Sequence, residues 1–335
     1  MTAVSVIICA FGPQPYLADA VDAVLRSRDV DAEVIVVDNG SPDCADLPDE
    51  VTVLRPGTNT GFAGGCNLGA GQAAGQTLAF VNSDAIVDPQ CLVRLHAGAV
   101  RPGAGLVGAT IVLADDPGEV NSWGNPVNLL GFSWAGGYGH PVSEVVSGER
   151  ASVSGAVFAV RREVFAALQG MDAQFFAYGE DVDLSLRTWL RGATVEVLAQ
   201  ARAAHHYEFA RNPDKWYLLE RNRLVTVLTT YEGRTLLGLA PLLAAGEAAV
   251  LLRSVREGWA RQKVRGWGWL LTHRRYLRSR RNRVQGSRVC GDEVLMRHLT
   301  TDLQPPARFG ISVPPGVQRL VTGYWRRIGS RVAGV

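Results

Sequence analysis

Asn82, Ser83 and Asp84 follow the short apolar run at residues 78–81, and Asp84 supplies the carboxylate best suited to chemistry in this stretch. Such a run is typical of a buried parallel strand. Open α/β sheets bind ligands just beyond the carboxyl ends of their strands. A carboxylate there can hold a hard divalent cation, which in turn neutralises a diphosphate. The alternative is a strand-end Asp that caps the following helix.

Three acidic residues, Glu180, Asp181 and Asp183, crowd the first turn of a predicted helix that ends at Gly192. Acidic side chains interact favourably with the N-terminus of a helix, but one carboxylate would suffice for that. Crowded carboxylates raise one another's pKa toward that of a useful general base. Because an aromatic segment at residues 175–178 lies beside them, we interpret the three acids as a candidate catalytic group.

A glycine-rich segment at residues 59–69 reads Asn-Thr-Gly-Phe-Ala-Gly-Gly-Cys-Asn-Leu-Gly. Glycines let backbone N–H groups approach a phosphate closely, and the start of a helix favours anions. We expect a helix over residues 65–74. Gly69, Gly71 and Gly75 do not make a dinucleotide-binding fingerprint, because the third glycine is one position too far and the segment precedes a strand.

Three further polar residues lie near predicted strand ends. Asp38 follows residues 33–37, where the alternative is a turn carboxylate that bonds its own backbone. His205 and His206 follow the predicted strand at residues 194–198. A histidine soon after a strand end can be a metal ligand, or it can be a buried structural residue. The sequence leaves both interpretations open.

These residues must be positioned by the elements around them, and along the chain short apolar runs typical of strands alternate with segments whose apolar residues recur at helical spacing. Leu17, Val21, Val24 and Leu25 form an apolar stripe at helical spacing between the first two predicted strands. This β–α–β order implies a right-handed crossover and a parallel sheet. Strands are predicted at residues 4–9, 33–37, 51–55, 78–81, 106–113, 153–160 and 194–198. Further helices are predicted at residues 89–100 and 162–168, besides the helix that begins at the acidic turn and ends at Gly192.

Residues 114–150 lack periodicity and are rich in Gly, Asn, Trp and Ser. Such a long irregular stretch inside a compact domain is usually functional or mobile. Trp123, Trp134 and Tyr138 in this stretch could stack on a sugar or could pin the loop, and the sequence favours neither.

Length and composition limit the class of protein. The 335 residues suffice for one large domain with an appendage or for two smaller domains. A content of 47% hydrophobic and 20% charged residues is typical of a protein with a globular core. The net charge of +2 gives no global field that would attract nucleic acid. Five scattered cysteines without a CxxC pair predict neither a zinc site nor a disulfide framework. We expect a cytoplasmic protein without a signal peptide.

The last part of the chain, residues 233–335, is predicted to be a helical, basic extension. Residues 235–252 are apolar but contain Pro241 and Glu247 and are barely long enough to cross a bilayer, so we expect an interfacial or packed helix. Residues 253–288 hold twelve Arg and Lys with Glu257 as the only acid, interleaved with tryptophans. This composition suits an anionic membrane surface. A solvated basic face is one alternative and nucleic acid is another, although the catalytic part explains the protein without nucleic acid.

Taken in order, these motifs resemble those of the family 2 glycosyltransferases, which have the GT-A fold. The resemblance covers about residues 1–230 and is greatest to bacterial rhamnosyltransferase-type enzymes. Each motif is weak alone, but five occur in the family's order. They are the strand at 4–9, Val-Val-Asp-Asn-Gly-Ser at 36–41, the glycine-rich segment at 59–69, Asn-Ser-Asp at 82–84 and Glu-Asp-Val-Asp-Leu at 180–184. The resemblance implies an α/β fold with a Rossmann-like, mainly parallel sheet flanked by helices.

The resemblance also implies a domain at residues 1–232, with a donor half at about 1–113 and an acceptor half at about 114–232. Its donor is a nucleoside-diphosphate sugar, and its cofactor is Mn²⁺ or Mg²⁺. The residues implied to bind the donor are Ala10, Asp38, Asn59, Gly61, Gly64, Asn67, Asn82 and Ser83.

Two catalytic roles follow from the same resemblance. Asp84 would bind the metal, with His205 or His206 as a further ligand, and Asp181 would be the general base. Asn82 stands where the family has the first acid of its Asp-x-Asp motif. Asp84 is therefore the only carboxylate of that motif, and the ribose contact becomes a neutral hydrogen bond.

These roles imply an inverting, metal-dependent transfer of a sugar, with rhamnose as a candidate, from a dTDP- or UDP-sugar to a saccharide acceptor. We expect a polyprenyl-linked acceptor in cell-envelope polysaccharide synthesis, and an enzyme bound peripherally to the cytoplasmic face of the cell membrane. A sugar-phosphate nucleotidyltransferase is an alternative, but residues 9–12, Cys-Ala-Phe-Gly, lack the glycine loop and basic residue that a triphosphate requires. An inactive GT-A fold acting as a carbohydrate-binding scaffold is another, against which the retained Asp84 and Asp181 argue.

Overall fold

The computed structural model describes residues 3–206, 214–306 and 312–333 and divides into two compact units. The first, here called the sheet unit, comprises Met1–Asn125, Ala135–Thr188 and Ala193–Phe209. The second, the helical unit, comprises Pro126–Trp134, Trp189–Gly192 and Ala210–Val335. Helix α6 (Lys215–Thr230) packs against helices α8 (Ala260–Thr272) and α9 (Arg274–Ser287) and lies in the helical unit. The expected domain boundary at residue 232, which would group α6 with the sheet, stays a prediction.

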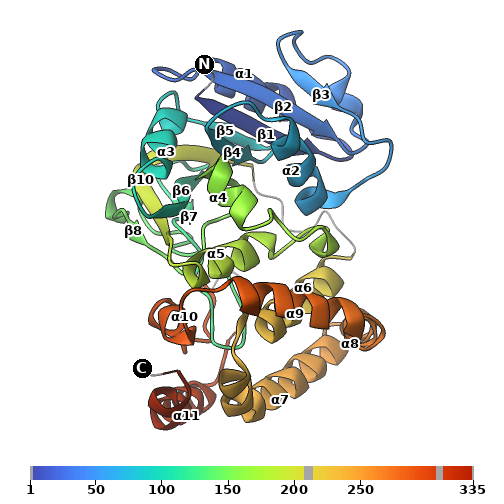
Figure 1. Ribbon diagram of the computed structural model, residues 1–335, viewed down its shortest axis with the longest axis vertical. Coiled ribbons are helices and arrows are strands. Elements are labelled where there is room, and N and C mark those ends of the chain that lie inside the picture. Colours follow the sequence, from blue (N-terminus) through green and yellow to red (C-terminus); the bar gives the residue numbers. More distant parts are fainter. Residues whose placement is uncertain (1–2, 207–213, 307–311, 334–335) are drawn as a thin grey trace. The chain divides into compact units, whose positions relative to one another are not determined.

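The sheet unit is built on a ten-stranded sheet of order β3-β2-β1-β4-β9-β6-β10-β5, in which β7 pairs with β6 and β8 pairs with β10 (Figure 1). The strands are β1 (Val4–Ala10), β2 (Ala32–Asp38), β3 (Thr52–Leu54), β4 (Thr77–Val81), β5 (Ala85–Val87), β6 (Ala104–Leu113), β7 (Val120–Ser122), β8 (Gly148–Glu149), β9 (Val157–Arg161) and β10 (Thr194–His205). Strands β3, β2, β1, β4, β6 and β10 run in one direction, and β9 lies antiparallel between β4 and β6. The expected α/β fold with a mainly parallel sheet is confirmed.

Two strands differ from their predicted bounds. The apolar run at 153–160 predicts one strand, but pairing with β4 and β6 begins only at Val157. The sequence also predicts that β10 ends at residue 198, whereas it continues to His205. A register shift between Leu198 and Arg202 takes up the extra residues, so that pairing with β6 resumes and carries His205 to the end of the strand.

Alternate residues of β1 point to opposite sides of the sheet, and different helices cover the two sides (Figure 1). Val4, Val6 and Ile8 share one hydrophobic core with residues of α1 (Leu17–Leu25) and α3 (Cys91–Ala99). Ile7 and Cys9 face α2 (Gly61–Gln72), which packs on β1 and β2. The carboxyl ends of β1 and β2 coincide, because Ala10 pairs with Asp38.

The long region predicted to be irregular contains only short elements: β7, β8 and the 3-10 helix Val142–Glu144. A side chain at Gly137 would lie 2.7 Å from the Trp123 ring, and Arg150 Nε donates a hydrogen bond to the Trp123 carbonyl at 3.1 Å. Of the two roles left open for Trp123, these contacts support pinning of the loop.

The other helices of the chain are α4 (Arg162–Ala167), α5 (Glu180–Leu190), α7 (Gly233–Arg256), α8 (Ala260–Thr272), α9 (Arg274–Ser287), α10 (Asp292–His298) and α11 (Pro315–Ala333). Within the described residues, α7 alone is long and apolar enough to cross a membrane, judged by length and composition.

A buried ionic network holds three of the helices of the helical unit together. Lys263 of α8 is fully buried, and its Nζ donates to Glu220 of α6 at 2.5 Å and to Glu247 of α7 at 2.7 Å. Arg223 also bonds both carboxylates, and Trp267 Nε1 donates to Glu247 at 2.6 Å. The single acid in the apolar part of α7 is therefore neutralised within the unit.

Candidate active site

Asp84 and His205 form the most direct candidate for a cation site. Asp84 lies between β4 and β5, and His205 ends β10, which pairs with β5 through His205 and Ala85. His205 Nε2 lies 3.0 Å from Asp84 Oδ1, while its Nδ1 lies 3.3 Å from Asn121 Oδ1. When Nδ1 donates to Asn121, Nε2 directs its lone pair at a carboxylate oxygen. The lone pair of His205 Nε2 and the negative charge of Asp84 Oδ1 repel each other. A proton or a cation bound by both atoms removes this repulsion, so this pair of ligand atoms fits a divalent metal.

The two adjacent histidines have different surroundings. The ring of His206 stacks on Tyr16 with centroids 3.6 Å apart and planes at 8°. Its backbone N–H donates to the Asp84 carbonyl at 3.0 Å. His205 is thus the histidine whose ring meets the Asp84 carboxylate. Among the residues that the structure describes, no group of three or more His, Cys, Asp or Glu side chains could hold a metal, so donor phosphates and water would have to complete the coordination.

The residues beside Asp84 are tied to the end of β1 and to the loop before β9. Ser83 Oγ donates to Gln14 Oε1 at 2.8 Å, and Gln14 Nε2 donates to the Phe11 carbonyl at 2.7 Å. The backbone N–H of Asn82 donates to the carbonyl of Ala156 at 2.8 Å.

Asp181, the predicted general base, is held by two backbone N–H groups. Gly155 donates to its Oδ2 at 2.9 Å and Val182 donates to its Oδ1 at 2.8 Å. Burial raises the pKa of Asp181, and the two hydrogen bonds oppose that rise. Because Gly155 directly precedes Ala156, which bonds Asn82, one short segment links Asp181 to the Asn-Ser-Asp motif. The structure therefore brings these two predicted groups together.

Glu180 has a different environment from its neighbour. Its side chain is buried, and its Oε2 has no hydrogen-bond partner within the described chain. Burial, followed by the nearby charge of Asp181, raises the pKa of Glu180 to about 8. The charge of Asp181 thus adds to burial in raising this pKa, as the crowding of the three acids predicts. Glu180 belongs to the candidate catalytic group, although the resemblance assigned the general base to Asp181.

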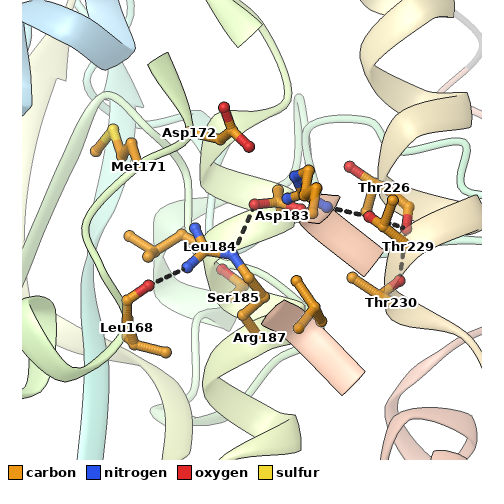
Figure 2. Close-up of polar contacts among 12 residues, drawn as sticks. Leu168, Met171, Asp172, Asp183, Leu184, Ser185, Arg187, Thr226, Thr229 and Thr230 are labelled. Carbon is orange, nitrogen blue, oxygen red and sulfur yellow. Dashed lines mark hydrogen bonds and ion pairs between the residues drawn. The ribbon is translucent and has the colours of Figure 1, made fainter. Parts of the chain in front are cut away.

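Asp183 has a structural role in α5. Arg187 Nε donates to Asp183 Oδ2 at 2.8 Å, and the same guanidinium donates to the carbonyls of Leu168 and Gly170 at 2.6 and 2.9 Å. Figure 2 shows Arg187 reaching both Asp183 and the Leu168 carbonyl. Asp183 thereby fixes the segment that leads into the acidic turn.

The glycines of the segment 59–69 allow close packing of α2. A Cβ at Gly61 would lie 2.4 Å from the carbonyl oxygen of Phe176, one at Gly65 would lie 2.8 Å from Cys9 Sγ, and one at Gly69 would lie 2.5 Å from Ile7. Gly64 is less crowded, with Thr60 Cβ at 3.1 Å. The helix begins at Gly61, not at residue 65, because Gly61 adopts a φ of +72° at the turn.

Two N–H groups at the start of α2, those of Gly61 and Ala63, are bonded within the protein. Asn59 Oδ1 accepts from Gly61 N at 2.8 Å, and the Phe176 carbonyl accepts from Ala63 N at 3.1 Å. Asn39 accepts from Thr60 N at 3.0 Å and donates to the Gly61 carbonyl at 3.1 Å. Sequence reasoning did not assign Asn39 to the site, although it lies in the quoted motif at 36–41.

Of the three remaining predicted donor residues, Asn67 and Asp38 make internal contacts through their side chains. Asn67 donates to the Met171 carbonyl at 2.7 Å and accepts from Met171 N at 3.0 Å, so its amide joins α2 to the segment before α5. Asp38 Oδ1 accepts from the N–H groups of Gly40 and Ser41, both at 2.9 Å. Its Oδ2 lies 3.4 Å from Arg55 Nε. Asp38 thus makes the turn contacts proposed as its alternative role, and its assignment to the donor stays a prediction, as does that of Ala10.

Two family models match the chain. Residues 5–168 match the model described as glycosyl transferase family 2, and residues 146–211 match the one described as N-terminal domain of galactosyltransferase. The chain is 35% identical over 162 residues to the O-antigen biosynthesis protein RfbC of Myxococcus xanthus. That match covers 44% of this chain, which spans only 12% of the length of that relative.

Solved structures of glycosyltransferases share the fold. The structure of GalNAc-T7 with UDP, GalNAc and Mn²⁺ has a TM-score of 0.56 at 18% identity and covers 68% of this chain and 48% of that one. The mannosyltransferase PcManGT from Pyrobaculum calidifontis, in complex with GDP-Man and Mn²⁺, has a TM-score of 0.50 at 16% identity and covers 85% of both chains. At these identities the likeness concerns the GT-A architecture of the sheet and its helices.

Proposed function

The chain is a member of glycosyltransferase family 2, and from that membership we propose that it transfers a sugar from a nucleoside-diphosphate sugar to a saccharide acceptor with inversion. The observation that carries the proposal is the linked arrangement of Asp84, His205 and Asp181. Asp84 and His205 would supply the cation site at the strand ends, and Asp181 is tied to the same motif through Gly155 and Ala156.

Asp84 and His205 would hold Mn²⁺ or Mg²⁺, which when bound offsets the charge that builds on the leaving diphosphate. Asp181 accepts the proton of the acceptor hydroxyl as its oxygen attacks the anomeric carbon. Each carboxylate oxygen of Asp181 has two lone pairs, so an oxygen that accepts from a backbone N–H can still accept a proton. Its raised pKa makes it a stronger base, and the two N–H bonds fix its direction. A single displacement by the acceptor inverts the anomeric carbon.

The donor is a dTDP- or UDP-sugar in this proposal, with rhamnose as a candidate sugar, and the acceptor is a polyprenyl-linked saccharide of the cell envelope. The match to an O-antigen biosynthesis protein supports polysaccharide synthesis. The neighbouring structures solved with UDP or GDP-Man and Mn²⁺ support a nucleotide-sugar donor and a divalent metal.

Donor hydrolysis tests the reaction class. Purified protein is incubated with dTDP-, UDP- and GDP-sugars, with Mn²⁺ or with EDTA, and the released nucleoside diphosphate is measured. A transferase releases it slowly with Mn²⁺ and not with EDTA. Release of pyrophosphate from a nucleoside triphosphate and a sugar phosphate would instead identify a nucleotidyltransferase. No turnover of any donor, with carbohydrate binding retained, would identify an inactive scaffold.

We also propose that the protein binds peripherally to the cytoplasmic face of the membrane. Leu237, Leu252 and Val255 of α7 are 78%, 53% and 61% exposed and recur at helical spacing, so they form an apolar face. Glu247 of the same helix is paired with Lys263 and Arg223 inside the helical unit. A helix with one exposed apolar face and one packed polar face suits the interface of a bilayer better than its centre.

Co-sedimentation with vesicles tests this location. Full-length protein is expected to pellet with phosphatidylglycerol vesicles, less so at high salt. Replacing Leu237, Leu252 and Val255 by Gln should reduce pelleting. A control carrying Gln at Leu25, Leu68 and Val146, which are exposed apolar residues of the sheet unit, should pellet like the wild type. Equal pelleting of both triple variants would refute the role of α7.

A further inference from the structure

A groove of about 390 Å³ lies within the helical unit, between the end of α6 and the first half of α9. Its lining includes Arg274, Arg275, Arg278, Arg281, Leu228 and Leu277. Four guanidinium groups therefore meet two apolar side chains in one hollow. Neither the family's reaction nor the residues of the sheet unit account for this combination.

Arg281 forms a fixed wall of the groove. Its Nη1 donates to the carbonyls of Leu228 and Tyr231 at 2.5 and 2.8 Å. These carbonyls lie at the end of α6, where the last turn lacks helical partners. Gln285 of α9 bonds the carbonyls of Thr229 and Thr230, both at 2.9 Å, so the wall is anchored twice.

Arg274, Arg275 and Arg278 have no such anchors. All three are exposed, and within the described chain none of them forms an ion pair or a side-chain hydrogen bond. Arg274 and Arg278 are four residues apart on one helix, where like charges repel each other. No acidic residue occurs in α9. A bound anion would relieve this repulsion.

The guanidinium groups and the apolar side chains of the groove indicate which kind of anion would bind there. The fork of a guanidinium matches the oxygens of a phosphate, which it can bind through two parallel hydrogen bonds. Three free guanidiniums match a diphosphate ester better than a phosphodiester, because a phosphodiester carries a single negative charge. Leu228 is 37% exposed at the groove and offers apolar surface beside the arginines.

We propose that this groove binds the diphosphate end of a lipid, with the diphosphate between the three free arginines and the first carbons of the chain on Leu228 and Leu277. This inference rests on the proposed function, because the lipid belongs to the class that we propose as the carrier of the acceptor saccharide. It assigns the recognition of that lipid to α6 and α9.

The test is calorimetric titration of the full-length protein with farnesyl diphosphate and with inorganic pyrophosphate, in EDTA to suppress binding through a cation. The groove variant R274Q/R275Q/R278Q is compared with R256Q/R261Q/R297Q. These control arginines are also exposed residues of the helical unit without a partner in the described chain, and the two variants have equal net charge. We expect the groove variant to bind farnesyl diphosphate at least about 100-fold more weakly, and the control less than about 3-fold more weakly.

A further variant, R274K/R275K/R278K, keeps the charge and loses the fork, and we expect about tenfold weaker binding. If the glutamine variant does not fold, this lysine variant still tests the proposed role of the guanidinium groups. Equal losses in the groove and control variants would overturn the proposal in favour of a general basic field. Equal affinity for pyrophosphate and farnesyl diphosphate would overturn the lipid assignment. Donor hydrolysis by the wild type is measured separately, so a failed transferase proposal and a failed groove proposal give different results.

Discussion

Replacing Glu180 by Gln should change how the stability of the protein depends on pH. Glu180 is buried, one of its oxygens has no partner within the described chain, and burial raises its pKa to about 8. In the unfolded chain the same carboxyl titrates near its ordinary pKa of 4.5. Between these two values the folded protein keeps a proton that the unfolded chain has released. Stability therefore falls as the pH rises through this window.

The magnitude follows from the difference between the two pKa values. Each unit of difference corresponds to about 1.4 kcal/mol, so the full effect is about 5 kcal/mol and is complete once the pH passes the folded pKa. Between pH 6 and pH 8 the wild type should lose about 2 kcal/mol through this group. Gln is neutral at every pH and similar in shape, so the variant should not show this loss.

Scanning calorimetry at pH 6 and pH 8 measures the effect. The Tm of the wild type should fall by about 4–8 °C more than that of Glu180→Gln, since about 1 kcal/mol shifts the Tm of a domain of this size by about 2–4 °C. Glu149→Gln, at an exposed position, serves as the control and should behave like the wild type. Parallel pH dependence of the wild type and Glu180→Gln would refute the assignment of the proton to Glu180.

The other predictions concern the cation site, the base and the glycines. Asp84→Ala should abolish transfer and weaken Mn²⁺-dependent binding of UDP or dTDP in thermal-shift assays without unfolding the protein, and near-normal turnover in Mn²⁺ would exclude Asp84 as a ligand. Asp181→Asn should lower kcat at least about 100-fold with little change in donor affinity. Asp183→Asn should lower the Tm through loss of its pairing with α5 and reduce kcat less, and the reverse order of the two kcat effects would exclude Asp181 as the base. Gly69→Ala should destabilise the fold by about 1–3 kcal/mol in urea unfolding because its Cβ would lie 2.5 Å from β1. Gly71→Ala in the same helix meets nothing within 4 Å and should be neutral or stabilising, so equal effects of the two would contradict the packing argument.

Periodicity predicted the elements that deliver polar groups to the strand ends. Apolar runs predicted β1, β2, β4 and β6, and the positions of Asp38 and Asp84 follow from where those runs stop. The antiparallel insertion of β9 could not be predicted, because a buried strand has the same composition in either direction. The continuation of β10 to His205 depends on a local register shift that has no signature in the sequence.

The sequence predicted which residue types form the candidate site better than it predicted the contacts that those residues make. Glycines at 59–69 suit a phosphate loop and a tightly packed helix equally well, and only the crowding around Gly61 and Gly69 distinguishes the two. Three crowded acids predicted raised pKa values, and burial raises those of both Glu180 and Asp181. The hydrogen bonds that oppose the rise at Asp181 come in part from a distant residue, which the sequence does not indicate. Gly155 donates to Asp181 and leaves Glu180 without an equivalent partner.

The place of β9 in the sheet affects how the chain can fold during synthesis. β4 ends at Val81 and β6 at Leu113, yet the strand that joins them spans Val157–Arg161. Until that strand leaves the ribosome, β4 and β6 each keep an unpaired edge, which is a template for aggregation. The first half of the sheet therefore cannot mature alone, and a nascent chain shorter than about 200 residues, allowing for the length hidden in the ribosome tunnel, should depend on chaperones that shield strand edges.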